Sequence, residues 1–240
     1  MNMSGFLLAA IFFLCLAHPA EAQAGDILKG AKTAIGGGGP SEGEVTGGLK
    51  EALQVGTGNA VAATSKLDGY YRNPKIKIPL PGPIQKVEGL LRAGGFGEKV
   101  DAFELSMNRA AERAAPEAKA IFWDAIKQMT LTDANKILHG ADDEATRYFQ
   151  RTSSARLGQA FKPIVHRSMS EVGVTRSYQE LEERVKATPF GSALNFDLDQ
   201  YVTDGALEGL FYMLAREEKR IRRNPAARTT ELLKKVFGGP

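Results

Sequence analysis

Histidine is the side chain best suited to bind a metal or move a proton at neutral pH, and this chain holds three. One lies in an N-terminal segment that we expect to be removed, which leaves His139 and His166. Neither belongs to an H-E-x-x-H or E-x-x-H frame, since Lys136 stands three positions before His139 and Pro163 three positions before His166. Those frames put two metal ligands on one helix face. Zinc-protease and di-iron sites are therefore disfavoured, and we expect His139 to serve a structural role at a helix C-terminus.

Two clusters of acidic side chains hold enough oxygen ligands for a calcium ion. They are Asp142, Asp143 and Glu144 in one cluster, and Asp197, Asp199 and Asp204 in the other. A calcium loop of the EF-hand type needs Gly at its sixth position and Glu at its twelfth, whereas the loop counted from Asp197 has Val202 and Glu208 there. Without that Gly, the acids fit better as residues that cap and begin helices. We predict no metal site and no cofactor.

The sequence also lacks the usual motifs that place a cysteine or serine as a covalent nucleophile. Cys15 is the only cysteine, and it lies inside the segment that we expect to be removed. Thr152, Ser153 and Ser154 form no G-x-S-x-G elbow and are explained as a helix cap. The glycines at 36–39 lack the Gly-Lys-Ser/Thr ending of a phosphate-binding loop. The sequence predicts no catalytic residue, although chemistry by Asp, Glu, Tyr or Arg stays open.

The N-terminus is typical of a secretory signal. Residues 5–16, GFLLAAIFFLCL, form an apolar run that is short for a membrane span. Two sites that a signal peptidase can cut follow it, after Ala22 and after Ala24. We predict a signal peptide over residues 1–22 and an exported protein, with an uncleaved anchor as the alternative because MNMS carries no Lys or Arg. Without Cys15, the exported chain has no disulfide and depends on core burial.

The formal net charge of +3 is mild, but its distribution is uneven. From Arg216 to the end, eight basic side chains accompany three acidic ones. We single out four candidate interaction residues: Arg220, Arg222, Arg223 and Arg228. Their expected partner is an envelope protein or an anionic envelope surface, and nucleic acid is not expected because the protein is exported. The alternative is a solvated helix face with pairs four residues apart, such as Glu218 with Arg222.

Helix signals and apolar spacing agree best between Ala114 and Gly140. The apolar residues recur at steps of three and four: Ile121, Phe122, Ala125, Ile126 and Met129. Thr130 or Thr132 can cap a second short helix, and a left-handed Gly140 would end it. We predict a helical hairpin at the centre of the domain, with Trp123 at the edge of its apolar face.

The same spacing predicts roughly nine helices along the chain and no convincing strand. One carries Tyr148 and Phe149, and a separate helix begins at a Ser153 or Ser154 cap and is kinked at Pro163. Further helices are expected over 178–185, 198–223 and 229–237.

Proline and glycine mark the segments that are not expected to be helical. Asn73 to Pro83, NPKIKIPLPGP, contains four prolines and is predicted to be an extended strap or an edge strand. Residues 23–40 are predicted to be a Gly-rich linker and residues 41–240 a single α-helical domain. The fold class is therefore all-α, with roughly nine helices and one proline-rich strap.

Several stretches spread over nearly all of the mature chain resemble a bacterial exported family known as domain of unknown function four-one-nine-seven. They are GLKEAL at 48–53, NP at 73–74 with IPLP at 78–81, NRAAE at 108–112, PEAK at 116–119, DAIKQMT at 124–130, the segment 149–153, and NPAARTT at 224–230 with LLKKVF at 232–237. The resemblance implies an α-helical protein of a Gram-negative periplasm or outer envelope. It brings no catalytic residues with it.

These observations favour a cofactor-free helical module that binds or interacts within the cell envelope. The first alternative is a carrier of a small apolar ligand, because the aromatic and Met-bearing face from Tyr201 to Leu214 could line a cavity. A thiol-free hydrolase comes third, since no recognisable motif supports it. A cavity bordered by polar groups would favour the carrier, and a filled core would favour the interaction module.

Overall fold

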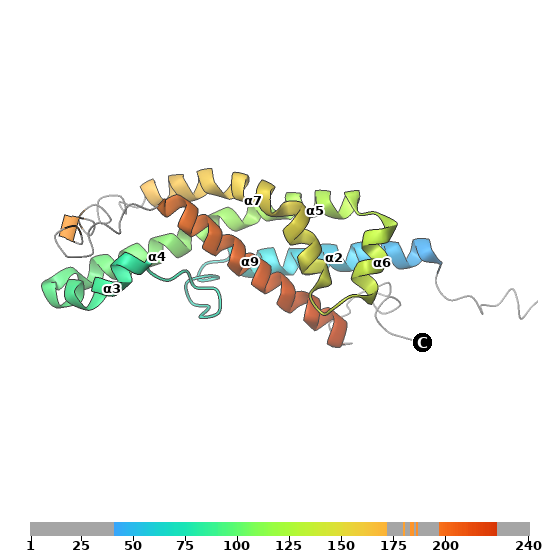
Figure 1. Cartoon of the computed structure of the whole chain (residues 1–240), viewed down its shortest axis with the longest axis horizontal. Helices are drawn as coiled ribbons and strands as arrows, with labels where there is room; N and C mark the ends of the chain where they lie inside the picture. Colours follow the sequence, from blue (N-terminus) through green and yellow to red (C-terminus); the bar gives the residue numbers. More distant parts are fainter. Residues whose placement is uncertain (1–40, 172–179, 181–182, 185, 187–196, 225–240) are drawn as a thin grey trace, which may run out of the picture. The chain divides into compact units, whose positions relative to one another are not determined.

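The computed structural model describes residues 41–171, 180, 183–184, 186 and 197–224 (Figure 1). The predicted signal peptide, the Gly-rich linker, the helix over 229–237 and most of the helix over 178–185 lie outside these residues.

The described residues are helical, with no strand among them, which confirms the all-α class. In chain order the elements are α2 (Glu42–Ser65), α3 (Gly82–Leu91), a π-helical turn (Arg92–Phe96), α4 (Gly97–Ala114), a 3-10 turn (Ala115–Glu117), α5 (Ala118–Gln128), α6 (Leu131–His139), α7 (Glu144–Glu171) and α9 (Leu198–Arg223). Gly95, with φ of 85°, supplies the left-handed residue at the kink between α3 and α4.

The prediction of roughly nine helices was too high for this part of the chain, where seven α-helices are found. The two helices expected to either side of Ser153 are one continuous helix, α7. Ser153 is buried in it, and Ser154 donates from Oγ to the carbonyl of Gln150 at 2.7 Å instead of capping a helix start. No Gly or Pro separates Phe149 from Ser153, so nothing in the backbone interrupts the helix there.

The two helices predicted between Ala114 and Gly140 are confirmed as α5 and α6, but each packs mainly against α2 and α7, so the predicted hairpin is not formed. Thr130 caps α6 in a reciprocal capping box with Asp133, and Trp123 is 37% exposed at the edge of α5. The left-handed conformation predicted for Gly140 is wrong, because its φ of −82° and ψ of −173° are extended.

Helix α9 packs against α2, α4 and α7 (Figure 1). Side chains of these helices and of α5 form one contiguous core that includes the fully buried Phe103, Phe122, Phe149 and Phe161. Phe122 meets Phe149 edge to face, with ring centroids 5.0 Å apart. The core residues thus come from helices distributed along the described chain.

A buried carboxylate ties α9 to the start of α7. Glu218 accepts hydrogen bonds from the backbone N–H groups of Ala145 and Thr146, each at 2.9 Å. Arg222 neutralises the same carboxylate at 2.9 Å and donates to the carbonyl of Ile137, near the end of α6, at 2.7 Å. The Glu218–Arg222 ion pair therefore satisfies two backbone N–H groups at the start of α7 and one backbone carbonyl near the end of α6.

The connection between α2 and α3 is held by side chains of α4. The structure assigns no strand to residues 73–83, so the edge strand is not formed. Instead Asn108 accepts from the N–H of Ile78 at 2.8 Å and donates to its carbonyl at 2.9 Å. Glu112 accepts from the N–H of Tyr70 at 3.1 Å, and the fully buried Tyr70 hydroxyl donates to the carbonyl of Ala206. These side chains satisfy backbone N–H and C=O groups that a neighbouring strand would satisfy in a sheet.

We expect Glu218→Ala to lower the free energy of unfolding by about 3 to 5 kcal/mol, because it leaves Arg222 buried without its partner and uncaps α7. Urea unfolding followed by circular dichroism measures this change. The matched control is Glu208→Ala, on an exposed position of the same helix, which should change the value by no more than about 0.5 kcal/mol. Equal losses in the two variants would contradict the role given to Glu218.

Candidate functional site

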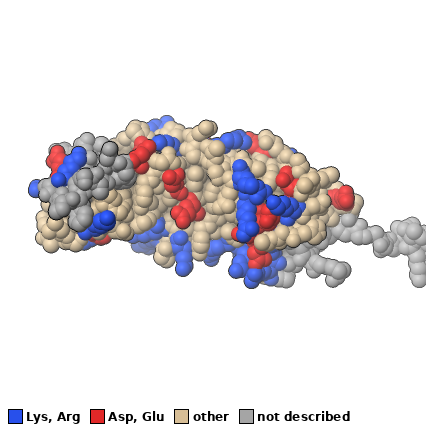
Figure 2. Space-filling model, in the orientation of Figure 1, with Lys and Arg blue, Asp and Glu red and all other residues tan. Residues whose placement is uncertain are grey.

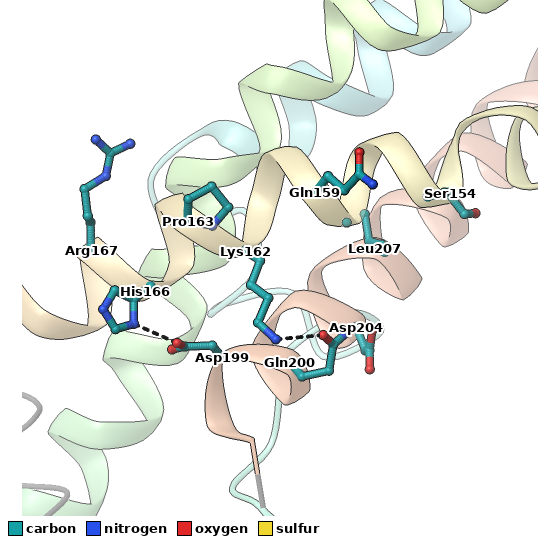
Figure 3. A pocket seen from close by; sticks show the side chains of 12 residues that line it. Ser154, Gln159, Lys162, Pro163, His166, Arg167, Asp199, Gln200, Asp204 and Leu207 are labelled. Carbon is teal, nitrogen blue, oxygen red and sulfur yellow. Dashed lines mark hydrogen bonds and ion pairs between the residues drawn. The ribbon is translucent and has the colours of Figure 1, made fainter.

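A hollow on the described surface lies between α7 and the N-terminal half of α9. This α7–α9 groove encloses about 1080 Å³ and is open to solvent along its length. Its apolar lining comes from small side chains of α7 and one leucine of α9: Ala155, Gly158, Pro163 and Leu207. Polar side chains surround this lining (Figure 3).

The groove is hollow because α7 carries little bulk there. Gly158 has no side chain, and a Cβ built on it would meet only Leu207, at 4.0 Å. Pro163 lies within α7 and has no N–H, so the carbonyl of Gln159 loses its usual helical donor. Gln159 and Pro163 both line the groove. The backbone carbonyl of Gln159 lacks the N–H donor that residue 163 would supply if it were not proline.

Two pairs of oppositely charged groups join the helices at one end of the groove. Figure 3 draws the contact of His166 with Asp199 and the hydrogen bond from Lys162 to Gln200. Lys162 of α7 contacts Asp197 at 2.7 Å and Gln200 at 3.1 Å. His166 of α7 contacts Asp199 at 2.7 Å. Asp197 is also the N-cap of α9, since it accepts from the N–H of Gln200 at 2.9 Å, which confirms the capping interpretation of this acid.

The Lys162–Asp197 pair shifts the pKa of both groups. The ammonium of Lys162, followed by the backbone N–H of Gln200, holds the pKa of Asp197 below its ordinary value. The carboxylate of Asp197 raises the pKa of Lys162. Both side chains are exposed to solvent, so the pair positions the helices and contributes little stability.

Asp204 differs from the other acids of the groove. Its carboxylate accepts from Nε2 of Gln200 at 2.8 Å, and no cation of the described residues forms an ion pair with it. Glu208, one turn further along, is exposed as well. Figure 2 shows acidic side chains, drawn in red, over the first half of α9.

The His166–Asp199 pair has the spacing of a general base and its orienting acid, but no hydroxyl of the described residues forms a hydrogen bond with the ring of His166. Ser170 donates to the backbone carbonyl of His166 and not to its ring. Ser154 lies twelve residues earlier on α7, about 18 Å away along the helix axis. Among the described residues no group of three or more His, Asp, Glu or Cys side chains is placed to hold a metal ion.

The other predicted acids take part in ion pairs. Asp142 contacts Arg223, Asp143 contacts Arg147 at 3.1 Å, and Glu144 lies 3.6 Å from Lys136.

The structure does not bring the candidate interaction arginines together as a free basic face. Arg222 is bound to Glu218, as the i,i+4 pattern predicted, but both side chains are buried and not solvated. Arg220 contacts Glu217 at 2.5 Å, and Arg223 contacts Asp142. Arg228 lies outside the described residues.

The helix face from Tyr201 to Leu214 is packed in the core in part, and in part it borders hollows of the surface. Leu210, Phe211 and Leu214 are buried within the hydrophobic core. Near the C-terminal half of α9, beside Glu218 and Arg222, a void of about 20 Å³ remains. Residues 75–79 and α9 border a separate cleft of about 330 Å³.

A family model described as a protein of unknown function, DUF4197, matches residues 39–238. The chain belongs to the DUF4197 family. No curated protein and no solved structure matches the chain. Within the described residues of this DUF4197 protein, no helix is both long and apolar enough to cross a membrane.

The residues that support the resemblance include several that hold the DUF4197 fold together. Asn108 and Glu112 bind the connection between α2 and α3, and Thr130 caps α6. The α7–α9 groove was not predicted. Several of its lining residues stand out in the sequence, namely Pro163, His166, Asp199 and Asp204, but their positions along the chain do not show that they lie together.

We expect Lys162→Met to raise the pKa of Asp197 toward its ordinary value. The substitution removes the ammonium group that lowers this pKa most, while the hydrogen bond from the N–H of Gln200 remains. Carboxyl NMR titration of the full chain measures it. Since the folded-state pKa is the lower one, the interaction stabilises the protein above about pH 4 and is lost as the pH falls through the folded value. Arg167→Met is the matched control on α7, and an equal pKa change in both variants would refute the direct pairing.

Two glycine substitutions should change stability in opposite directions. Gly158→Ala should raise the free energy of unfolding by about 0.5 to 1 kcal/mol, because its Cβ enters open space and a helical glycine is removed. Gly209→Ala should lower it by about 1 to 3 kcal/mol, because its Cβ would lie 2.5 Å from the ring of Tyr70. Denaturant unfolding of both variants checks the pair, and a loss for Gly158→Ala would show that the groove is more tightly packed than described.

Proposed function

We propose that this DUF4197 protein is a cofactor-free interaction module that binds a segment of a partner protein in the α7–α9 groove. The observation that carries the proposal is the contrast between this open groove of about 1080 Å³ and the filled core beside it. Sites that recognise peptides combine an apolar lining with polar groups at the edge, and the groove has both.

The groove is organised before any partner arrives. Lys162 and His166 fix α7 to the start of α9 through Asp197 and Asp199. At the other end of α9, Glu218 fixes the start of α7. A surface held in this way loses little conformational entropy when a partner binds, which favours affinity.

The proposal places the partner in the cell envelope, supported by the signal-like segment at residues 1–22. Arg220 and Arg223, together with Arg228, are proposed as a secondary contact to an anionic envelope surface. This contact is supported by the excess of basic residues in the C-terminal segment. Arg220 and Arg223 also form ion pairs with Glu217 and Asp142.

The second candidate is a carrier of a small apolar ligand. One observation favours it: the volume of the groove is close to the upper end of small-molecule sites, about 300 to 1,000 Å³. An open groove leaves much of such a ligand in water, so the partner segment is the better occupant.

Site-specific photo-crosslinking in the native host tests the interaction module. A photoreactive amino acid replaces Ala155, which is exposed and lines the groove, or Ala120, an equally exposed alanine on α5. We expect a discrete polypeptide adduct at position 155 and none at 120. Adding Gly158→Leu, which fills the groove, should reduce the adduct. No adduct at 155, or equal adducts at both positions, would overturn the proposed function.

A further inference from the structure

We infer that two copies of this chain associate through an exposed ridge of α9, with the two helices antiparallel and the two Tyr212 side chains at the centre. The α9 ridge consists of five exposed side chains, each four positions after the one before: Asp204, Glu208, Tyr212, Arg216 and Arg220. Positions four apart lie along one line of a helix surface. The inference goes beyond the proposed function, because it concerns this ridge and not the α7–α9 groove, which shares only Asp204 with it.

The order of charges along the α9 ridge reverses at Tyr212. Two carboxylates precede the tyrosine and two guanidinium groups follow it, at equal spacings of four and eight positions. When two such helices meet antiparallel with their tyrosines aligned, Glu208 of each copy faces Arg216 of the other, and Asp204 faces Arg220. The ridge is therefore complementary in charge to a second copy of itself. Figure 2 shows the two signs as red atoms over the first half of α9 and blue atoms near its end.

Interactions inside α9 do not explain this order of charges. The helix dipole favours acids at a helix start and bases at a helix end, but its effect falls off within the first and last turns. Glu208 lies ten residues after the start of α9, and Arg216 lies seven residues before its end. Along the ridge, Asp204 and Glu208 are like charges four positions apart, and so are Arg216 and Arg220. Such pairs destabilise a helix, and the opposite charges of a second copy would relieve both.

The inner contact, between Glu208 and Arg216, carries most of the attraction. Neither side chain forms an ion pair with another residue in the part of the chain that the structure describes. By contrast, Arg220 already contacts Glu217 at 2.5 Å. The contact of Arg220 with Asp204 of the other copy is therefore the weaker one.

Tyr212 supplies the apolar centre of the contact. Its side chain is 39% exposed and borders the cleft of about 330 Å³ between residues 75–79 and α9. A cavity of about 150 Å³ accommodates benzene, so this cleft has room for the ring of Tyr212 from the other copy. Tyrosine at the centre of an interface is a common source of binding energy, and here the charged pairs surround it.

Sedimentation equilibrium of the chain purified from its host tests the inference with charge reversals at exposed positions, where substitutions rarely change the fold. We expect the unchanged chain to form a dimer that is tighter at low ionic strength. Glu208→Arg or Arg216→Glu should weaken the dimer about tenfold, because each reversal brings like charges together in two symmetric contacts. In a one-to-one mixture of these two variants, every inner contact again joins opposite charges, so a heterodimer should form.

Glu98→Arg is the matched control, because it makes the same change of net charge at an exposed position of α4, outside the ridge. It should leave the dimer unchanged. Three results would each overturn the inference: an unchanged chain that stays monomeric up to about 1 mM, equal weakening by Glu98→Arg, or a mixture that associates no more than its separate variants. A crosslink from position 155 to a different polypeptide would still stand, so the proposed function is tested separately.

Discussion

The buried carboxylate of Glu218 is the contact on which the arrangement of α6, α7 and α9 depends. It lies at the N-terminus of α7, where two backbone N–H groups and the helix dipole favour a negative charge. Its counterion, Arg222, reaches the carbonyl of Ile137 in α6. A buried charge is costly when any of these partners is missing, so this ion pair favours the observed arrangement of the three helices. The position of α9 beside α7 follows from it.

That position produces a closed core and an open groove on the same pair of helices. Toward α2 and α4, large apolar side chains of α9 such as Leu210 and Leu214 fill the space between the helices. Toward the C-terminal half of α7, Gly158 and Ala155 leave space, and the ion pairs of Lys162 and His166 keep the helices joined. The first face contributes to stability, and the second forms the groove in which we propose that a partner segment binds.

Local features of the fold could be predicted from the sequence, because they depend on residues a few positions apart. The caps at Thr130 and Asp197 and the pairing of Glu218 with Arg222 are of this kind. The burial of that pair and the groove could not be predicted, since Glu218 meets Ala145 across 73 positions and His166 meets Asp199 across 33. Periodicity shows that a helix has an apolar face, but it does not show which helix covers that face.

Native mass spectrometry of the full chain purified from its own cells, compared with denaturing mass spectrometry, tests most directly whether this protein binds a partner segment or carries a ligand. The account predicts a native mass equal to the bare chain, or to the chain with a polypeptide that separates on denaturation. A small apolar molecule retained in the native state and lost on denaturation would contradict it. That result would make the α7–α9 groove, or the core beside it, the site of a carrier.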